Sequence, residues 1–314
     1  MYTPTSVFKN KPKAAAGPPA ASNLIDDVGV DAVIAVGLRK LRAGYTGDCI
    51  QVRRASDNAT QDIGFVGEDV DTAAIASFCT GTNGYVHTWY DQSGNGFDLI
   101  QTTAGNLIYD VTAGVVTDSQ GNTASKTTEL SDTSGVGDYF QQGPAYTGKS
   151  NKTPTLCMVM EYYYGGSAIT IAENGNGYAM GTYGANNNKF KTIKSNGLAI
   201  AQLGTISQGD TFAVMNFMND DAGTNLSFMN GSSNAGLGNG GTEALNKEIY
   251  TAEGFNAPTY DQTQFFYCCA ASLAQNMFFH EFVFWDITAT ETTLTAIEQT
   301  AYFTNVNTYY SLIF

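Results

Sequence analysis

The chain has 314 residues, of which only 14% are charged, and its formal net charge is −14. This acidic balance argues against nucleic acid and anionic membrane surfaces as main partners, because both repel an acidic protein. The few charges, set among abundant Gly, Ser, Thr and Asn, predict a neutral polar surface, which is common among exposed virion and extracellular β proteins.

The five cysteines show no C-x-x-C spacing, so neither a zinc site nor a disulfide framework is indicated, and no metal or cofactor is expected. Buried free thiols are the expected state of Cys49, Cys79 and Cys157. The adjacent Cys268 and Cys269 are also interpreted as buried thiols, with a strained vicinal disulfide as the alternative.

Residues 1–23 are predicted to form an extended arm, because their four prolines remove backbone donors and resist helix formation. Basic residues are concentrated in this part of the chain: residues 1–54 hold eight Lys or Arg against four Asp. We therefore predict that the arm anchors the chain to another protein through Lys9, Lys11 and Lys13. The alternative is that these are ordinary solvated charges.

The first residues also lack the apolar core of a signal peptide, so the product is expected to fold in a cytoplasm. Residues 24–314 contain no obvious linker and no repeat of fixed period, and they are predicted to form a single domain.

Several local elements are predicted before residue 80. The apolar residues of 32–41 fall close to one helical face and are followed by basic side chains, which predicts a helix. Strands are predicted over 49–54 and 62–66, with a polar turn at 56–58 between them. Asp71 is predicted to cap a short helix that runs to Phe78.

The stretch 84–98 is the one around which the chain is organised. Its first half alternates β-branched and aromatic residues, which predicts a strand covered on both faces. A fold-defining motif then turns the chain, because its polar side chains can bond their own turn and its glycines allow positive φ. The motif consists of Trp89, Tyr90, Asp91, Gln92, Ser93, Gly94, Asn95 and Gly96. A calcium loop is the less favoured alternative, since its twelfth position is Thr102 and no helix precedes it.

Beyond residue 98 the chain is typical of short strands separated by Asn-Gly and Gly-rich turns. Strands are predicted near 107–111, 139–141, 155–164, 168–172, 178–183, 190–193, 211–218, 226–229, 264–272 and 277–285. The last strand places Phe278, His280, Phe282 and Phe284 on one face, and a capping box at Thr288 and Glu291 then begins a C-terminal helix. This pattern predicts a mainly β jelly-roll sandwich with a few short helices.

Residues that could carry chemistry are few. His87 and His280 lie inside strand patterns and are interpreted as core or sheet histidines rather than catalytic bases. Glycoside hydrolysis needs two carboxylates across a cleft; the acids on or beside predicted strands are Glu161, Glu173, Asp220, Asp221, Glu281 and Asp286, and most are interpreted as surface acids. Glycan stacking is one interpretation of Tyr162, Tyr163 and Tyr164, although structural packing is favoured.

Residues 35–101 resemble the amino-terminal part of the arabinofuranosidase B catalytic-domain family and its relatives among bacteriophage structural proteins. The matching segments are 38–41, 45–47, 51–54, 56–57, 61–64, 77–79 and 89–96. Residues 281–310 are also similar to the last strand and helix of concanavalin-A-like jelly rolls. The resemblance implies a concanavalin-A-like or laminin-G-like β-sandwich, in agreement with the strand pattern.

The resemblance does not supply catalytic residues. Its enzymes carry the nucleophile and the acid later in the chain, in acidic, glycine-rich segments beside paired cysteines, and no match to those segments is found here. The first hypothesis is therefore a non-enzymatic bacteriophage virion protein: a fibre, decoration or appendage subunit, made in the host cytoplasm and anchored in the virion by its arm. A homo-oligomer, such as a trimer, and contact with a host-surface glycan are expected with it. The alternatives are an arabinofuranosidase-like glycoside hydrolase and a free carbohydrate-binding module.

Overall fold

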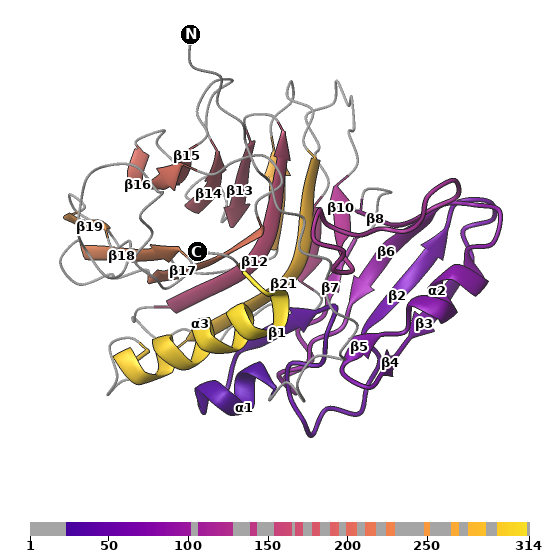
Figure 1. Cartoon of the computed structure of the whole chain (residues 1–314), viewed down its shortest axis with the longest axis horizontal. Coiled ribbons are helices and arrows are strands. Elements are labelled where there is room, and N and C mark those ends of the chain that lie inside the picture. The colour runs from indigo at the N-terminus through magenta and orange to yellow at the C-terminus, as the bar shows by residue number, and fades with distance from the viewer. Residues whose placement is uncertain are drawn as a thin grey trace, which may run out of the picture.

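The computed structural model describes residues 23–101, 106–127 and 294–312, apart from a few side chains, together with a set of strands between residues 139 and 286. Only part of the side chains on those strands is described. The chain is mainly β, with three short helices among the described residues (Figure 1).

The larger hydrogen-bonded ladder is antiparallel throughout. Its order is β3 (Thr60–Ile63), β2 (Ile50–Arg54), β6 (Gly84–Trp89), β8 (Asn106–Asp110), β10 (Ser125–Thr127), β21 (Asn276–Asp286), β12 (Pro154–Tyr164), β17 (Thr211–Phe217), β18 (Thr224–Met229) and β19 (Glu248–Thr251). Strand β1 (Ile34–Gly37) also pairs with β21. It pairs along the same edge of β21 as β10, but nearer to the C-terminal end of that strand. The long strand β21 therefore joins the first and last parts of the chain.

A second antiparallel ladder runs β11 (Tyr139–Gln142), β20 (Phe265–Cys269), β13 (Ser167–Ile171), β14 (Tyr178–Thr182), β15 (Lys189–Lys194) and β16 (Ala199–Thr205). Strand β11 also pairs with β7 (Leu99–Ile100), which links the two ladders. The remaining short strands are β4 (Phe65–Val66), β5 (Asp69–Val70) and β9 (Gly114–Val115).

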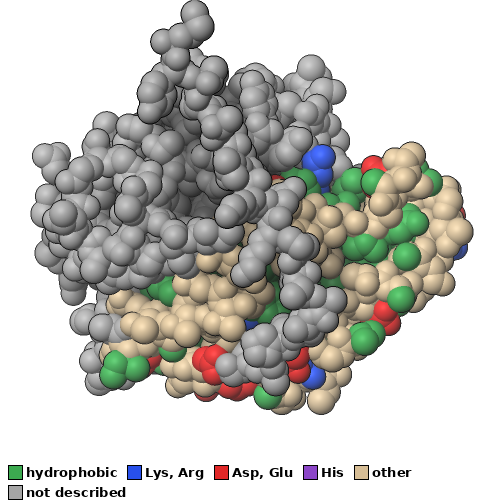
Figure 2. Space-filling model, viewed as in Figure 1, with side chains coloured by type: hydrophobic (Ala, Val, Ile, Leu, Met, Phe, Trp, Pro, Cys, Tyr) green, Lys and Arg blue, Asp and Glu red, His purple; other side chains and the backbone are tan. Residues whose placement is uncertain are grey.

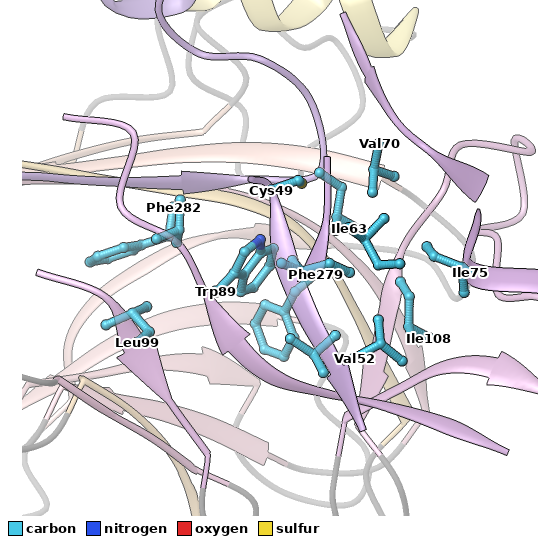
Figure 3. Close-up of a cluster of buried hydrophobic side chains, with 14 of the residues drawn as sticks. Cys49, Val52, Ile63, Val70, Ile75, Trp89, Leu99, Ile108, Phe279 and Phe282 are labelled. Atoms are coloured by element: carbon cyan, nitrogen blue, oxygen red, sulfur yellow. The ribbon is translucent and has the colours of Figure 1, made fainter. Parts of the chain in front are cut away.

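Two apolar cores lie on opposite faces of the β12 and β21 pair. The first joins β1, β2, β6 and β8 to Met158, Met160 and the phenylalanines of β21. Trp89 lies in this core among Phe279, Phe282 and Leu99 (Figure 3). The second core lies under the helices and contains Cys157, Val159 and Trp285. Each buried apolar side chain contributes roughly 1.5–3 kcal/mol, so these cores are the main source of stability.

Two of the helices cover the second core (Figure 1). Helix α1 (Leu24–Val28) ends at Gly29 in the left-handed conformation, and α3 (Ala296–Tyr310) begins with a capping box formed by Thr295 and Glu298. The third helix, α2 (Thr72–Phe78), begins at Asp71, whose side chain accepts a hydrogen bond from the backbone N–H of Ala74. This last cap confirms the prediction made for Asp71.

The predicted helix over 32–41 is wrong, because these residues form β1 and the irregular segment after it. All four residues of β1 are buried, with Ile34 and Val36 in the first core and Ala35 in the second. A strand buried on both faces shows a continuous apolar run, which sequence periodicity does not distinguish from a helical face.

The predicted face of β21 is also wrong. The pairing of β12 with β21 shifts register between Val159 and Met160, opposite His280. This bulge places Phe279, rather than Phe278, in the first core with Phe282 and Phe284. The predicted capping box at Thr288 and Glu291 lies outside the described residues, and the box that begins α3 is formed by Thr295 and Glu298 instead.

Most strands between residues 49 and 285 lie within a few residues of their predicted bounds. The predicted strand over 62–66 is divided at Gly64 into β3 and β4. Strands β5, β7, β9, β10, β16 and β19 were not predicted. The described part of the surface in Figure 2 is dominated by neutral side chains and backbone, with few basic groups, as the composition predicts.

Candidate functional site

The fold-defining motif holds the N-terminal segment against the sheet. The Gln92 side chain accepts from the backbone N–H of Leu41 and donates to the carbonyl oxygens of Gly37 and Arg39. Asn95 Nδ2 donates to the carbonyl of Ala32 at 3.0 Å. These contacts satisfy backbone groups just before β1, at its last residue and just after it. The motif is thus a structural clamp.

The oxygens that a calcium loop would need are already used in this turn. Asp91 Oδ1 accepts from the N–H groups of Ala35 and Ser93, and Oδ2 accepts from the hydroxyl of Ser93 and the N–H of Phe97. Asp98 in turn accepts from the N–H of Asp91. Both acids therefore bind their own turn, which is the favoured interpretation from sequence.

A first buried charge cluster, the Arg39 cluster, consists of Arg39, Glu281, Tyr309 and Tyr310. Arg39 binds Glu281 through two nitrogens, Nε at 2.7 Å from Oε2 and Nη2 at 3.1 Å from Oε1. Tyr310 donates to Glu281 Oε2 at 2.8 Å, and the Tyr309 ring centroid lies 4.3 Å from the Arg39 guanidinium carbon. Both charged side chains are 1% exposed. Burial raises the pKa of Tyr310, and the Glu281 charge adds to this effect.

A second buried cluster, the Asp118 cluster, consists of Asp118, Glu161, Thr211 and His280. The ladder register brings it together: Glu161 on β12 stands opposite Thr211 on β17 and Phe278 on β21. Asp118 reaches the cluster from the loop between β9 and β10, where Gly121 adopts a φ of 85°. Four separate parts of the chain thus meet at one point.

The hydroxyl of Thr211 lies between the two carboxylates. Its Oγ1 is 3.0 Å from Asp118 Oδ2 and 3.5 Å from Glu161 Oε2. Glu161 Oε2 accepts from the backbone N–H of Ser119 at 2.6 Å. His280 Nε2 lies 3.2 Å from Asp118 Oδ2, and His280 Nδ1 lies 3.0 Å from the carbonyl oxygen of Thr123. His280 is therefore a buried histidine whose Nδ1 contacts a carbonyl oxygen, while its Nε2 lies close to a carboxylate without forming a hydrogen bond.

The two carboxyl groups have pKa shifts of opposite sign. Burial raises the pKa of Glu161; hydrogen bonds from the side chain and the backbone of Ser119 act in the other direction, and the charge of Asp118 adds to the increase. Burial also acts to raise the pKa of Asp118, but His280 and the donors of Asn122 outweigh it, so this pKa is lowered. Opposite shifts in a pair of carboxyl groups are typical of acid and base assignments in glycosidases.

Burial limits what the Asp118 cluster can do chemically. Glu161 is 1% exposed, Asp118 is 5% exposed and His280 is fully buried. A glycosidic bond must reach both carboxyl groups of a catalytic pair, and no sugar reaches this pair in the closed loop conformation. The cluster therefore holds the β9–β10 loop on the sheet. Sequence analysis identified Glu161 and His280 but missed Asp118, because nothing local distinguishes it from any other Asp in a Gly-Asn turn.

Of the other candidate site residues named from sequence, the structure describes the side chain of His87. His87 is half-buried on β6 and contacts the Thr88 hydroxyl. Strand β12 includes the backbone of Tyr162, Tyr163 and Tyr164, and β20 includes that of Cys268 and Cys269, but these side chains lie outside the described residues. So do the arm with Lys9, Lys11 and Lys13, the acids Glu173, Asp220 and Asp221, and the side chain of Asp286.

Among the residues that the structure describes, no three or more His, Cys, Asp or Glu side chains are grouped in a way that could hold a metal ion. In the same part of the chain, no helix has the length and apolar character needed to cross a membrane. Cys49, Cys79 and Cys157 are buried free thiols, which confirms the prediction for these three.

The fold defines a class: the chain is a mainly β sandwich protein with a large antiparallel sheet. Its structure is similar to a GH54 α-L-arabinofuranosidase soaked with a cyclic sulfate inhibitor, at a TM-score of 0.55 and 16% identity, over 90% of this chain and 64% of the other. An arabinofuranosidase complexed with arabinofuranosyl-α-1,2-xylobiose gives a TM-score of 0.52 at 15% identity, over 90% and 65% of the two chains.

The sequence defines the family. Residues 29–216 match the family described as "Alpha-L-arabinofuranosidase B, catalytic", and the chain belongs to this family. It is 27% identical over 167 residues to alpha-L-arabinofuranosidase B of Aspergillus oryzae, covering 48% of this chain and 33% of that protein. It is 42% identical over 71 residues to a probable alpha-L-arabinofuranosidase B of Aspergillus terreus, covering 22% and 14%. The chain thus spans a third or less of these curated relatives.

These findings overturn the first hypothesis from sequence. The prediction of a non-enzymatic bacteriophage virion protein, located in the virion, is wrong, because the family is one of glycosidase catalytic domains and the matched relatives are fungal arabinofuranosidases. A lack of local matches to catalytic segments does not exclude the enzyme, because catalytic carboxylates are brought together by tertiary structure. The arm boundary, the oligomeric state and the glycan contact stay predictions.

Proposed function

We propose that the chain is a glycoside hydrolase that acts on α-L-arabinofuranosides. The observation that carries the proposal is the family match over residues 29–216, which extends well beyond the motif that ends at Gly96. The similarity to solved arabinofuranosidases over 90% of the chain supports the same fold on both sides of that match.

The buried carboxylates of the described residues are poor candidates for the reacting groups. Glu281 is fully occupied by Arg39 and Tyr310, and Glu161 and Asp118 are sealed under the β9–β10 loop. Glycosidases place one carboxylic acid and one carboxylate on either side of the bond to be cleaved, roughly 5–9.5 Å apart. We therefore place the reacting pair among acids outside the two clusters, with Glu173, Asp220, Asp221 and Asp286 as the first to replace.

The test is the hydrolysis of 4-nitrophenyl α-L-arabinofuranoside by the whole chain. The release of nitrophenol measures the rate. Each acid is replaced singly by its amide, and folding is checked by circular dichroism. The proposal predicts that the wild-type chain hydrolyses the substrate. It also predicts that the rate of at least one folded variant is lower by 100-fold or more, because general acid–base catalysis alone contributes roughly 10²–10⁴-fold. Glu161→Gln is the matched control and is expected to retain turnover.

Two results would contradict the proposal. One is a folded chain that releases no nitrophenol above the buffer rate from this and other aryl glycosides. The other is turnover that no replacement of an acid reduces, since the activity would then come from a contaminant.

A further inference from the structure

We propose that Glu161 keeps a proton in the folded chain under conditions where exposed glutamates are ionised, and that it donates this proton to Thr211 as part of a latch on the β9–β10 loop. This inference does not depend on the glycosidase proposal. It follows from the count of donors and acceptors in the Asp118 cluster.

Asp118 is surrounded by donors and behaves as a carboxylate. Its Oδ1 accepts from the N–H groups of Gln120 and Asn122 at 2.9 and 2.7 Å. Its Oδ2 accepts from Asn122 Nδ2 and from the hydroxyl of Thr211, and it faces His280 Nε2. A protonated Asp118 would lose at least one of these donors, so the single hydroxyl proton of Thr211 is directed to Asp118.

The oxygen of Thr211 then presents only lone pairs to Glu161. An ionised Glu161 would place its Oε2 opposite those lone pairs at 3.5 Å, with no proton between the two oxygens. A proton on Glu161 converts this contact into a hydrogen bond from Glu161 to Thr211. The result is a chain of donors in one direction: Glu161 to Thr211, and Thr211 to Asp118.

Charge balance leads to the same assignment. His280 lies beside the carbonyl oxygen of Thr123 at Nδ1 and a carboxylate oxygen of Asp118 at Nε2, and one imidazole can balance at most one carboxylate. Two ionised carboxyl groups would therefore leave the sealed cluster with a net negative charge, which burial makes costly. The raised pKa of Glu161 agrees with the neutral form.

Among the residues that the structure describes, the other charged and titratable groups around the cluster do not supply a balancing charge. Tyr310 of α3 packs on His280, with ring centroids 5.1 Å apart, and its hydroxyl is committed to Glu281. Arg39 is paired with the same Glu281. On β10, Lys126 lies over the ring of Phe278, and its Nζ is 5.7 Å from the ring centroid. Among these described groups, a proton on Glu161 is therefore what removes the second negative charge from the cluster.

The consequence is a loop whose attachment depends on pH from both sides. A group with a lowered pKa, Asp118, contributes stability that is lost as the pH falls through its folded pKa. A carboxyl with a raised pKa, Glu161, contributes stability that is present below the ordinary glutamate pKa and is lost as the pH rises through its folded value. The loop is held best between the two pKa values.

Infrared difference spectroscopy in D₂O tests the assignment, because a protonated carboxyl and a carboxylate absorb in separate C=O regions. The spectrum of the wild type minus that of Glu161→Gln at neutral pH should show a protonated-carboxyl band that disappears as the pH is raised. Glu298→Gln, which replaces a glutamate at the start of α3, is the control and should remove carboxylate absorption only. A carboxylate band assigned to Glu161 at neutral pH would overturn the proposal.

Urea unfolding provides the second measurement. The amide of Glu161→Gln can donate to Thr211 and accept from Ser119, so it imitates the protonated acid. Its urea midpoint should equal or exceed that of the wild type at neutral pH, and the difference should widen as the pH rises. A midpoint below that of the wild type at every pH contradicts the proposal. If this variant does not fold, a ¹³C titration of the labelled Glu161 carboxyl in the wild-type chain decides between the two forms.

Discussion

The Arg39 cluster and the Asp118 cluster are both buried, and both contact Tyr310, but they solve the problem of a buried carboxylate in different ways. In the Arg39 cluster one guanidinium pairs with one carboxylate through two contacts. In the Asp118 cluster two carboxyl groups share one imidazole and one hydroxyl. The first can be neutral with both groups ionised, whereas the second can be neutral only with a proton on one acid.

The bulge in β21 explains why two such different clusters lie side by side. His280 and Glu281 are consecutive residues, and in a regular strand their side chains would point to opposite faces. The shift of register at Val159 and Met160 brings both side chains to the side that α3 covers. One irregularity thus supplies the partners of two separate segments, the one that follows β1 and the β9–β10 loop.

The largest effect is expected when the Arg39 cluster loses one of its charges. Glu281→Gln leaves the Arg39 guanidinium buried without a counter-charge, and we expect a loss of about 3–5 kcal/mol in the free energy of unfolding. Urea unfolding at neutral pH measures it. Asp57→Asn breaks the exposed ion pair with Arg54 and is the control, with no separable change expected. A loss no larger than that of the control would show that the Arg39 pair does not hold β1 to β21.

The next effect concerns the clamp that fixes the backbone of Arg39. Gln92→Ala leaves the N–H of Leu41 and the carbonyl of Arg39 without their partner, and we expect a loss of about 2–3 kcal/mol. Gln51→Ala removes a surface amide that bonds Asp62 and should change stability far less. Hydrogen exchange should also show faster exchange of the Leu41 amide. Unchanged exchange would mean that the motif does not position this segment.

A smaller effect is expected from Asp118, and it should depend on pH. Asp118→Asn removes a buried carboxylate that accepts from Gln120, Asn122 and Thr211, and we expect about 2 kcal/mol less stability at neutral pH. The wild type should lose stability as the pH falls through the lowered pKa of Asp118, and the variant should lose less over the same range. Urea midpoints at a series of pH values measure the slopes. Parallel slopes for the two proteins would show that Asp118 is not the group that titrates.

The smallest effect in this comparison is expected from Thr211→Val, which keeps the shape of the side chain and removes the hydroxyl between the two carboxyl groups. We expect a loss of about 1 kcal/mol, since Asp118 retains its other donors. The infrared band of the Glu161 carboxyl should shift in this variant, because its acceptor is gone. An unchanged band would place the acceptor elsewhere.

The sequence predicted the β-rich fold and the turn after β6 because both depend on local chemistry. The contacts of Gln92 with Gly37, Arg39 and Leu41 were not predicted, because they join residues 51 to 55 positions apart. Alternating residues of β6 and the turn-forming residues after it are adjacent in the chain, and so is the Asp71 cap. The segment 32–41 was predicted wrongly because a strand buried between two cores has no polar face. The clusters could not be predicted, since Asp118 and His280 are 162 positions apart by residue number and meet only through the register of β12, β17 and β21.

The function was also predicted wrongly, for a related reason. The segments that carry the resemblance lie between residues 38 and 96, whereas the family match extends to residue 216. Catalytic carboxylates are brought together by tertiary structure rather than by spacing, so a lack of local motifs says little about them.

The most direct test of the account is the hydrolysis of 4-nitrophenyl α-L-arabinofuranoside by the whole chain and by Glu161→Gln, side by side. We predict that both release nitrophenol at similar rates, because the Asp118 cluster attaches a loop and the reacting acids lie elsewhere. A well-folded chain that releases none would contradict the proposed function. Turnover in the wild type that a folded Glu161→Gln loses would instead show that the buried pair is catalytic and that the loop must open.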